Sequence, residues 1–305
     1  MFDVVIVGGS FAGLSAALQL ARASRSVLIM DNGHPRNRMS PAAHGVPGWD
    51  GVPPTEILAR FRSDLAGYPT VSFLNDGAEG ISGAVDAFEV TTQSGECIRA
   101  RRIILSHGVR DILPDLPGLD DAWGRTVLHC PYCHGYEVKG RPLAVLATGP
   151  MATHQAHMLR ADWSEDVTVL VNGVSDFDQQ ALGVSGIRIE TRRLLRLEAV
   201  DGIRVTFQDG PAADFAAIFT APRVDLAGSP ADRMGVGTSE GPMGPYVRTG
   251  PMQQTDIPGV FAAGDVATAM WNVNFAVGDG ARAGVGCHQS LLFPDFIPAL
   301  EKEAA

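Results

Sequence analysis

Two cysteines separated by two residues are the positions whose spacing points most directly to chemistry. Cys130 and Cys133 lie in the run His129 to His134, which reads His-Cys-Pro-Tyr-Cys-His. Two sulfurs at this spacing can close a small disulfide loop, and the spacing commonly lowers the pKa of one thiol, so that thiolate is present near neutral pH. The pair therefore predicts thiol–disulfide exchange.

Other uses of the cysteine pair compete with this interpretation. Cys130 to His134 also matches the attachment pattern of c-type haem, a chemistry that expects an exported chain. A zinc site would need His129, Cys130, Cys133 and His134 to surround one tetrahedral ion, and no second Cys-x-x-Cys completes a usual ligand set. A glutaredoxin would carry Cys-Pro-Tyr-Cys near the start of a short domain, whereas this pair begins at position 130. Two buried thiols without a role are the structural alternative, and we expect no metal.

A glycine-rich loop follows the first predicted strand. In a dinucleotide-binding fold the first glycine permits a tight turn, the second lets the backbone approach the pyrophosphate, and the third allows close helix–strand contact. Gly8 and Gly13 fill the outer two places, Ser10 fills the middle one, and Asp31 ends the next strand, where an acid for a ribose hydroxyl is expected. An ordinary strand-to-helix turn is the alternative. The predicted cofactor-binding residues of this segment are Gly8, Ser10, Phe11, Ala12, Gly13, Asp31 and Asn32.

The corresponding loop of a second nucleotide fold, Ala147 to Ala152, has lost much of the pattern. Only Gly149 and the small Ala152 survive, and a methyl group at position 147 would crowd the turn. The next strand ends at Val171-Asn172-Gly173, which offers neither an acid for a ribose hydroxyl nor arginines for a 2′-phosphate. We therefore expect a weakened or lost nucleotide site, with NAD(P)H bound through unusual contacts as the alternative.

The order of elements indicates an α/β protein built from two tandem Rossmann-like domains. We expect residues 1–113 and 222–305 to form one discontinuous domain, which binds the cofactor, and residues 114–221 to form a second, NAD(P)-binding-like domain that carries the cysteine pair. Strands are predicted at 2–7, 26–30, 88–92, 97–102, 103–105, 143–146, 167–171, 196–198, 203–207, 217–221 and 260–263, and helices at 14–23, 152–161 and about 272–292.

Composition narrows the class of protein. A chain of 305 residues can bury two cores, and its net charge of −10 gives no attraction to nucleic acid or anionic lipid. No apolar run approaches the ~20 residues that span a bilayer. The N-terminus lacks the pattern of a signal peptide, so we expect a cytoplasmic protein. The two remaining cysteines, Cys97 and Cys287, are predicted to be unreactive packing residues.

The combination of motifs resembles the bacterial-type thioredoxin reductase family over nearly the whole chain. An N-terminal glycine loop, a dithiol that opens the second domain and the late run Thr255 to Asp265 carry the resemblance. It implies FAD as the cofactor and a homodimer. Gly264 and Asp265 would contact the ribityl and pyrophosphate region of FAD, and Asn272 and Val273 would lie at the pyrimidine edge of the flavin, where a helix N-terminus favours the anionic ring.

The resemblance also implies roles for the dithiol. Cys133 would be the thiol near the flavin, and Cys130 would exchange with the substrate. The family has an aspartate directly after the pair, whereas this chain has His134, whose imidazole suits proton transfer near neutral pH. A solvated loop histidine is the alternative. His44 and Trp49 lie in the stretch where relatives line the flavin ring, so they either shape the substrate mouth or pack the loop.

The run Cys130 to Glu137 looks closer to the dithiol oxidases of gliotoxin and holomycin biosynthesis. This implies that a small or peptidic dithiol reduces the Cys130–Cys133 disulfide, that Cys133 passes two electrons to FAD, and that O2 reoxidises the flavin to give hydrogen peroxide. A thioredoxin reductase fed by NADPH or by reduced ferredoxin is the alternative, and a non-catalytic flavin redox sensor is a third. Trp271 and Phe275 either border an aromatic pocket or pack the core.

Overall fold

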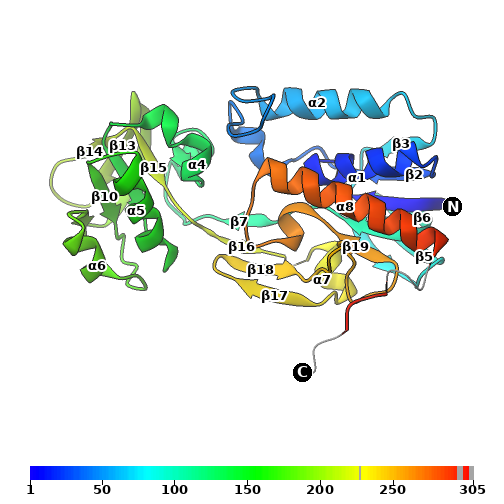
Figure 1. The fold of residues 1–305 in the computed structure, drawn as a ribbon. Helices are drawn as coiled ribbons and strands as arrows, with labels where there is room; N and C mark the ends of the chain where they lie inside the picture. Colours follow the sequence, from blue (N-terminus) through cyan, green and yellow to red (C-terminus); the bar gives the residue numbers. More distant parts are fainter. Residues whose placement is uncertain (227, 294–297, 302–305) are drawn as a thin grey trace. The chain divides into compact units, whose positions relative to one another are not determined.

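The computed structural model describes residues 1–226, 228–293 and 298–301 (Figure 1). Contacts between Cα atoms divide the chain into two compact units. The first unit comprises Met1–Arg36, Thr55–Arg110 and Asp225–Ala305, and the second comprises Asn37–Pro54 and Asp111–Val224.

The first unit contains a mostly parallel sheet in the order β3-β2-β1-β6-β5-β4, with β19 also paired to β6. The central strand β1 reads Phe-Asp-Val-Val-Ile-Val, and Val4, Val5 and Ile6 are fully buried, as expected for a parallel strand covered on both faces. Residues 97–105, predicted as two strands, form the single strand β6. The strands are β1 (Phe2–Val7), β2 (Val27–Met30), β3 (Val71–Leu74), β4 (Ala78–Ser82), β5 (Phe88–Thr92), β6 (Cys97–Leu105) and β19 (Val260–Ala262).

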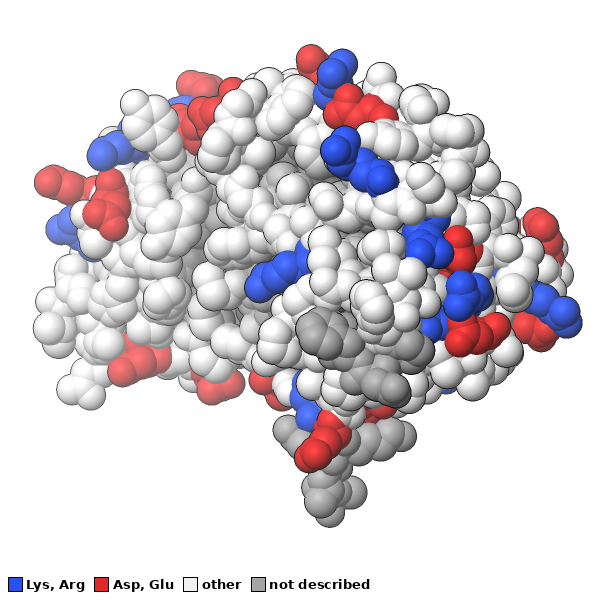
Figure 2. Space-filling model, turned by 45° about the vertical axis from the view of Figure 1, so that its right-hand side comes forward, with Lys and Arg blue, Asp and Glu red and all other residues white. Residues whose placement is uncertain are grey.

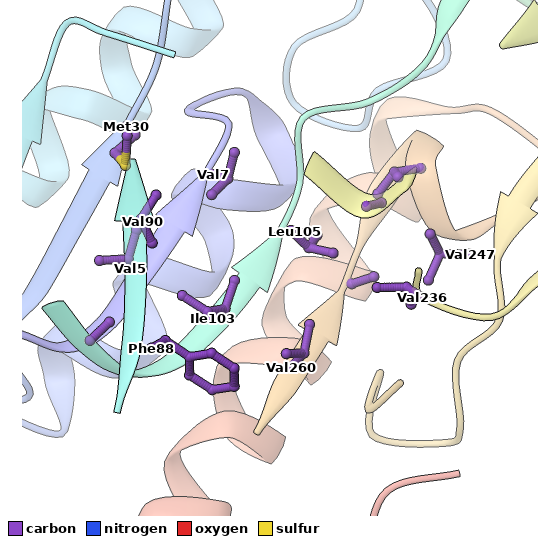
Figure 3. Close-up of a cluster of buried hydrophobic side chains, with 14 of the residues drawn as sticks. Val5, Val7, Met30, Phe88, Val90, Ile103, Leu105, Val236, Val247 and Val260 are labelled. Atoms are coloured by element: carbon purple, nitrogen blue, oxygen red, sulfur yellow. The ribbon is translucent and has the colours of Figure 1, made fainter. Parts of the chain in front are cut away.

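One core cluster of this unit lies between the sheet and the later chain segments. Figure 3 shows Val5, Ile103, Leu105 and Val260 converging from β1, β6 and β19. The remaining elements of the unit are the helices α1 (Phe11–Arg22), α2 (Pro54–Leu65), α7 (Pro230–Met234), η3 (Gly264–Ala267) and α8 (Val273–Leu292), and the hairpin β17 (Thr238–Gly241) and β18 (Gly244–Val247).

Helices α1 and α8 pack against each other at very short range (Figure 1). A Cβ atom added to Gly280 would lie 2.1 Å from the carbonyl oxygen of Ala12, so only glycine allows this approach. Ser15 of α1 donates a hydrogen bond of 2.7 Å to the carbonyl of Val277. This packing holds the start of α1 beside the N-terminal half of α8.

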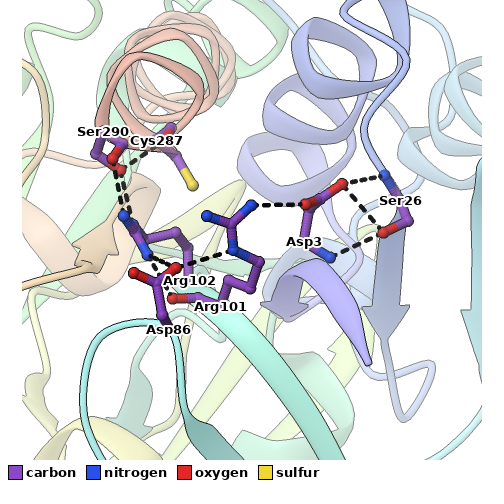
Figure 4. A network of polar contacts seen from close by, with 7 residues as sticks. All are labelled: Asp3, Ser26, Asp86, Arg101, Arg102, Cys287 and Ser290. Carbon is purple, nitrogen blue, oxygen red and sulfur yellow. Dashed lines mark hydrogen bonds and ion pairs between the residues drawn. The ribbon is translucent and has the colours of Figure 1, made fainter. Parts of the chain in front are cut away.

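A buried arginine fastens β6 to the other end of α8 (Figure 4). Arg102 has a side chain that is 1% exposed, and it donates to the carbonyl of Ser290 at 2.8 Å and to its hydroxyl at 3.0 Å. A third bond of 2.9 Å reaches the carboxylate of Asp86, which is half exposed. The guanidinium is therefore paired as a buried charge must be.

The second unit has a five-stranded parallel sheet in the order β11-β10-β9-β15-β8 and a three-stranded antiparallel sheet, β12-β13-β14. The apolar strands β9 and β10 are buried throughout. Their bounds are β8 (Val127–Leu128), β9 (Leu143–Leu146), β10 (Val167–Leu170), β11 (Arg188–Glu190), β12 (Leu194–Val200), β13 (Gly202–Phe207), β14 (Ala213–Phe215) and β15 (Ala217–Phe219). The helices are α3 (Leu119–Ala122), α4 (Pro131–His134), η2 (Tyr136–Val138), α5 (Met151–Asp162) and α6 (Gln179–Val184).

Two short paired strands, β7 (Arg110–Ile112) and β16 (Arg223–Asp225), lie where the chain passes between the units. They fall close to the predicted crossings. The segment Asn37–Pro54, which follows the start of η1 (Arg36–Met39), differs from the predicted domain division because it groups with the second unit. An antiparallel bridge between Ala43 and Val52 closes this segment, and its polar side chains contact α4, a long-range contact that no local pattern encodes.

The surface carries mixed charge. On the face shown in Figure 2, the described basic side chains lie singly or beside acidic ones rather than in an extended patch. Over the residues that the structure describes, no helix combines the length and the hydropathy needed to cross a membrane.

Candidate active site

The two cysteines lie at the start of the short helix α4. Cys130 is its N-cap and Pro131 its first residue, a position that suits proline because its fixed φ matches the helix and its missing N–H has no partner to lose. Gln155 of α5 donates a 2.6 Å hydrogen bond to the carbonyl of His129, which fixes the chain directly before Cys130. Both cysteines are free thiols and are partly buried, so the structure represents the reduced pair.

The two thiols have opposite electrostatic environments. The hydrogen bond from the Cys133 thiol lowers the pKa of Cys130, and the backbone N–H groups of Cys133 and Tyr132 lower it further, against the opposing effect of burial. The pKa of Cys133 is raised, because its thiol donates to Cys130 and is itself buried. Of the two thiols, Cys130 is therefore the one that loses its proton first, while Cys133 keeps its proton.

His134 has a defined tautomer. The Ser40 hydroxyl donates to the carbonyl of Ala42 at 2.7 Å, so its oxygen must accept the 3.1 Å hydrogen bond from Nε2 of His134. The neutral ring therefore carries its proton on Nε2, and Nδ1 presents a lone pair. This Nδ1 atom is buried without a hydrogen-bond partner. Burial and the neighbouring His44 lower the pKa of His134, partly offset by Glu137, so the ring is a neutral base at pH 7.

A second histidine lies against the first. The rings of His44 and His134 pack edge to face, with centroids 6.1 Å apart. Nδ1 of His44 lies 3.6 Å from carboxylate oxygens of both Asp50 and Glu137. The sequence predicted that His44 either shapes the substrate mouth or packs its loop. The structure places it beside His134, the predicted proton carrier.

The predicted cofactor residues gather within the first unit, at the carboxyl ends of adjacent parallel strands. Val7 pairs with Leu105, and Leu105 with Ala262, so the loops that follow β1, β6 and β19 share one edge. In open α/β sheets this edge is where ligands bind. The two outermost residues of the first loop, Gly8 and Gly13, lie at this edge together with Gly264.

The glycines of the first loop are required by their surroundings. Gly8 has a φ of +106°, and a Cβ atom there would lie 2.3 Å from the carbonyl oxygen of Ser106. A Cβ atom on Gly13 would lie 1.9 Å from the carbonyl oxygen of Gly8. The Ser106 hydroxyl donates to that same Gly8 carbonyl at 2.8 Å. The tight turn thus depends on the two glycines and on Ser106, the residue directly after β6.

The start of α1 fits the pyrophosphate of a dinucleotide. Ser10 is the N-cap, yet its side chain makes no capping hydrogen bond, so it leaves the backbone N–H groups of the first turn to another partner. Phe11 and Ala12 begin the helix and are almost fully buried. Unpaired N–H groups together with the helix dipole make this end suited to phosphate oxygens. The cradle that FAD would need is therefore present.

Asp31, the acid expected to bind the ribose, is already partly engaged. It forms an ion pair with Arg62 of α2 and accepts a 3.2 Å hydrogen bond from the N–H of Gly33. Arg62 also donates to the carbonyl of Gly9 at 3.2 Å. Since a carboxylate has about four acceptor sites, Asp31 can still receive a ribose hydroxyl. The neighbouring Asn32 side chain accepts weakly, at 3.4 Å, from the N–H of His34.

The late motif forms a second polar group in the same unit. Asp265 pairs with Arg36 at 3.0 Å, and the guanidinium of Arg36 lies 4.0 Å from the ring centroid of Trp271. The indole N–H of Trp271 donates to the Asp265 carbonyl at 3.2 Å. Asn272 is the N-cap of α8, where its side chain accepts from Asn274, and Val273 is the first helical residue. Trp271 thus contacts both Arg36 and Asp265, whereas the side chain of Phe275 is 49% exposed.

The second glycine loop is poorly suited to phosphate. Ala147 is buried in the turn, and Pro150 occupies the N-cap of α5, where it offers no N–H. The sequence predicted no arginine at the strand end Val171-Asn172-Gly173, and this is true only of the residues next to it in the chain. Arg193 reaches this place from the loop before β12, donates to the carbonyl of Asn172 at 2.8 Å and covers Gly173.

Several site residues escaped the sequence analysis because their partners lie far away along the chain. Ser106 and His107 could have been found, since they follow a predicted buried strand as the loop of Gly8 does.

The two cysteines outside the pair differ in exposure. Cys97 is exposed, so its predicted packing role is wrong, whereas Cys287 is fully buried. No group of three or more His, Cys, Asp or Glu side chains among the described residues is placed to hold a metal ion. The other overlooked residues are Arg36, Ser40, Arg62, Glu137 and Arg193.

Comparison with known proteins places this geometry in a family. The family model described as pyridine nucleotide-disulphide oxidoreductase matches residues 2–280. The thioredoxin reductase tcpT of Claviceps purpurea is 34% identical over 95% of this chain and 94% of its own. The thioredoxin reductase sirT of Leptosphaeria maculans is 32% identical over 97% of this chain and 96% of its own.

Solved structures agree with this assignment. An oxidoreductase from Agrobacterium tumefaciens is 42% identical, covers 96% of this chain and 99% of its own, and superposes with a TM-score of 0.90. HlmI is 33% identical over 97% of this chain and 94% of its own, with a TM-score of 0.88. The predicted α/β fold with two Rossmann-like domains is confirmed. The chain belongs to the FAD-binding pyridine nucleotide-disulphide oxidoreductase family, as a flavin-dependent disulfide oxidoreductase of the thioredoxin reductase type.

Proposed function

We propose that the protein oxidises a small or peptidic dithiol to a disulfide, with molecular oxygen as the electron acceptor. The substrate loses two electrons and two protons and gains an S–S bond, and oxygen takes up both to give hydrogen peroxide. The observation that carries the proposal is that one short helix, α4, carries both Cys130, whose thiolate is stabilised, and a neutral His134 whose Nδ1 has no hydrogen-bond partner.

The residues of α4 account for the exchange step. A substrate thiolate attacks the Cys130 sulfur of the enzyme disulfide, the Cys130–Cys133 bond breaks, and Cys133 leaves with the electron pair. The second substrate thiol attacks the mixed disulfide, closes the substrate disulfide and releases Cys130 as thiolate. One of the two substrate protons ends on Cys133 and the other on Nδ1 of His134. Bound FAD supplies the two-electron carrier between this dithiol and oxygen.

The second glycine loop supports the oxidative direction. A reductase of this family draws electrons from a pyridine nucleotide, whose phosphates need backbone N–H groups at the second loop. Ala147 and Pro150 weaken that site through a crowded turn and a missing N–H. We therefore expect a dithiol, rather than a pyridine nucleotide, to donate the electrons.

Two exposed aromatic side chains support a substrate with an apolar or peptidic body. Tyr132 and Tyr136, which flank Cys133 and His134 in the sequence, are 76% and 79% exposed. Tyr132 packs edge to face on Trp163, with ring centroids 5.8 Å apart, which orients its ring. Aromatic side chains of this kind offer large contact areas with little loss of conformational entropy.

One observation favours a thioredoxin reductase as a second candidate. Arg193 lies at the end of β10, near the place where an arginine would bind the 2′-phosphate of NADPH, although its guanidinium already donates to the Asn172 carbonyl. The names of the relatives agree with this candidate.

An anaerobic titration followed by flavin absorbance distinguishes the two. For the oxidase we expect dithiothreitol to bleach the flavin, air to restore it with one hydrogen peroxide per dithiol, and NADPH and NADH to have no effect within minutes. Rapid bleaching by NADPH would overturn the oxidase and support the reductase. In that case Arg193→Ala should slow reduction by NADPH but not by NADH.

A Cys130→Ser variant provides the control. It should retain FAD, because no predicted cofactor residue is changed, and its flavin should stay oxidised when dithiothreitol is added. Bleaching of this variant at the wild-type rate would mean that the dithiol reduces the flavin directly, and the exchange step would be wrong.

A further inference from the structure

His107 lies in the loop that follows β6, at the edge where the cofactor residues gather. Its backbone touches the first glycine turn, because a Cβ atom on Gly8 would lie 2.7 Å from the His107 nitrogen. β6 lies between β1 and β19, so this loop sits between the glycine loop and the Asp265 motif. None of the cofactor residues predicted from the sequence belongs to it.

The ring of His107 has one defined tautomer. Nδ1 lies 3.0 Å from the carbonyl oxygen of Gly108, and since a carbonyl can only accept, Nδ1 carries the proton. Nε2 of the neutral ring is therefore an acceptor with a lone pair. That atom is buried and has no hydrogen-bond partner, although the residue as a whole is partly exposed. An unsatisfied buried acceptor costs stability unless a ligand satisfies it.

Burial lowers the pKa of His107 to about 4, partly offset by the Gly108 carbonyl. The ring therefore stays neutral at physiological pH and can only accept at Nε2. Phosphate oxygens carry no proton at this pH, so they cannot satisfy it. Hydroxyl, amino and imide N–H groups can.

We propose that His107 is a cofactor-binding residue whose Nε2 accepts a hydrogen bond from a hydroxyl, amino or imide N–H donor of FAD. The proposal rests on the FAD chemistry of the family and on the geometry of the first unit, and it does not depend on the direction of electron flow. It assigns His107 a part distinct from that of α1, whose N–H groups suit the pyrophosphate.

Titration of the apoprotein with FAD, followed by quenching of flavin fluorescence, tests the proposal without any turnover. His107→Leu removes the acceptor, and we expect its dissociation constant to rise about tenfold, the effect of one hydrogen bond to a buried group. His107→Gln restores an acceptor oxygen and should recover most of the affinity. An unchanged dissociation constant in His107→Leu would overturn the proposal.

His288→Leu is a matched control, since it removes a partly buried histidine of the same unit. It lies 15 residues beyond Val273 along α8, about 22 Å from the start of the helix, so FAD affinity should stay at the wild-type value. A comparable loss in this variant would mean that any such substitution weakens the unit, which would overturn a specific role for His107.

The pH dependence of FAD binding to the wild-type protein gives an independent test that needs no variant to fold. An accepting Nε2 predicts a dissociation constant that is constant from pH 8 to 6 and rises as the pH approaches 4, because protonation removes the lone pair. A protonated ring paired with the pyrophosphate predicts the opposite, tighter binding as the pH falls. The second result would overturn the proposal.

Discussion

Nε2 of His134 lies 3.1 Å from the hydroxyl oxygen of Ser40, a residue 94 positions earlier in the chain. That hydroxyl donates its own proton to the Ala42 carbonyl, so its oxygen can only accept a hydrogen bond from the imidazole. The proton of the neutral imidazole is therefore on Nε2. The other ring nitrogen, Nδ1, therefore carries the lone pair and is the base in the proposed thiol exchange. A serine in a loop thus decides which nitrogen of the proposed catalytic histidine can accept a proton.

Removing the Ser40 hydroxyl should slow the exchange reaction. In Ser40→Ala the ring loses its Nε2 partner and can adopt either tautomer, so we expect flavin reduction by a dithiol to slow by about tenfold, the effect of one hydrogen bond. Stopped-flow absorbance measures this rate. Ser40→Thr keeps the hydroxyl and should remain within a factor of about three. A wild-type rate in Ser40→Ala would show that the contact does not position the ring.

The rate should depend on pH through His134. Burial and His44 lower its pKa below the ordinary value of about 6.5. The base is therefore present at neutral pH and is lost as the pH falls through that lowered pKa, so the rate should fall only on the acidic side. His134→Ala should slow the reaction ~100-fold or more and abolish this fall in rate at acidic pH. His44→Phe removes one of the groups that lower the pKa of His134, so the fall in rate should begin at a higher pH. A fall at an unchanged pH would contradict the role of His134 as the base.

The two thiols should differ in their reaction with iodoacetamide. Cys130 carries a lowered pKa because Cys133 donates to it, so in the reduced protein Cys130 should be alkylated first near pH 7. Mass spectrometry after brief labelling measures this order. Cys133→Ala removes the donor, so the pH at which Cys130 is half alkylated should rise. Labelling is done in a Cys97→Ser background, since Cys97 is exposed. Preferential alkylation of Cys133 would reverse the proposed roles.

A methyl group in the first glycine loop should abolish FAD retention. Gly13→Ala would place its Cβ atom 1.9 Å from the carbonyl oxygen of Gly8, and a backbone atom cannot move aside without opening the turn. Flavin absorbance per protein after purification measures the loss. Gly278→Ala is the matched control, because the same change in α8 meets nothing within 4 Å. It should keep FAD and stabilise the helix by about 0.5–1 kcal/mol.

The buried arginine should contribute to stability. Arg102→Met leaves the Ser290 carbonyl without its 2.8 Å donor and Asp86 without one of its partners. We expect the free energy of unfolding to fall by about 2 kcal/mol, less than for a fully buried pair because Asp86 is half exposed. Urea denaturation at a fixed FAD concentration measures it. Arg99→Met, which removes an exposed pair with Glu89, should change stability by less than about 0.5 kcal/mol.

The amino-acid sequence by itself determined the elements and the chemistry that each local motif offers. Buried runs such as Phe2–Val7, glycines that begin a helix, and two cysteines at a fixed spacing are local patterns, so they can be recognised without knowing what lies beside them. The predicted bounds of β1, β5 and β9 therefore agree with the structure. The division of residues 97–105 into two strands was wrong because one strand changes partners along its length, from β5 to β19.

Only the tertiary structure decided the protonation of the site and the partners of its charged groups. The tautomer of His134 depends on Ser40, the environment of Asp31 on Arg62, and the strand end at Asn172 on Arg193. Each pair joins residues that are 21 or more positions apart in the chain. Hydrogen bonds and desolvation act over a few ångströms in space, and no periodicity or spacing in a single sequence records which distant side chains will lie within that range.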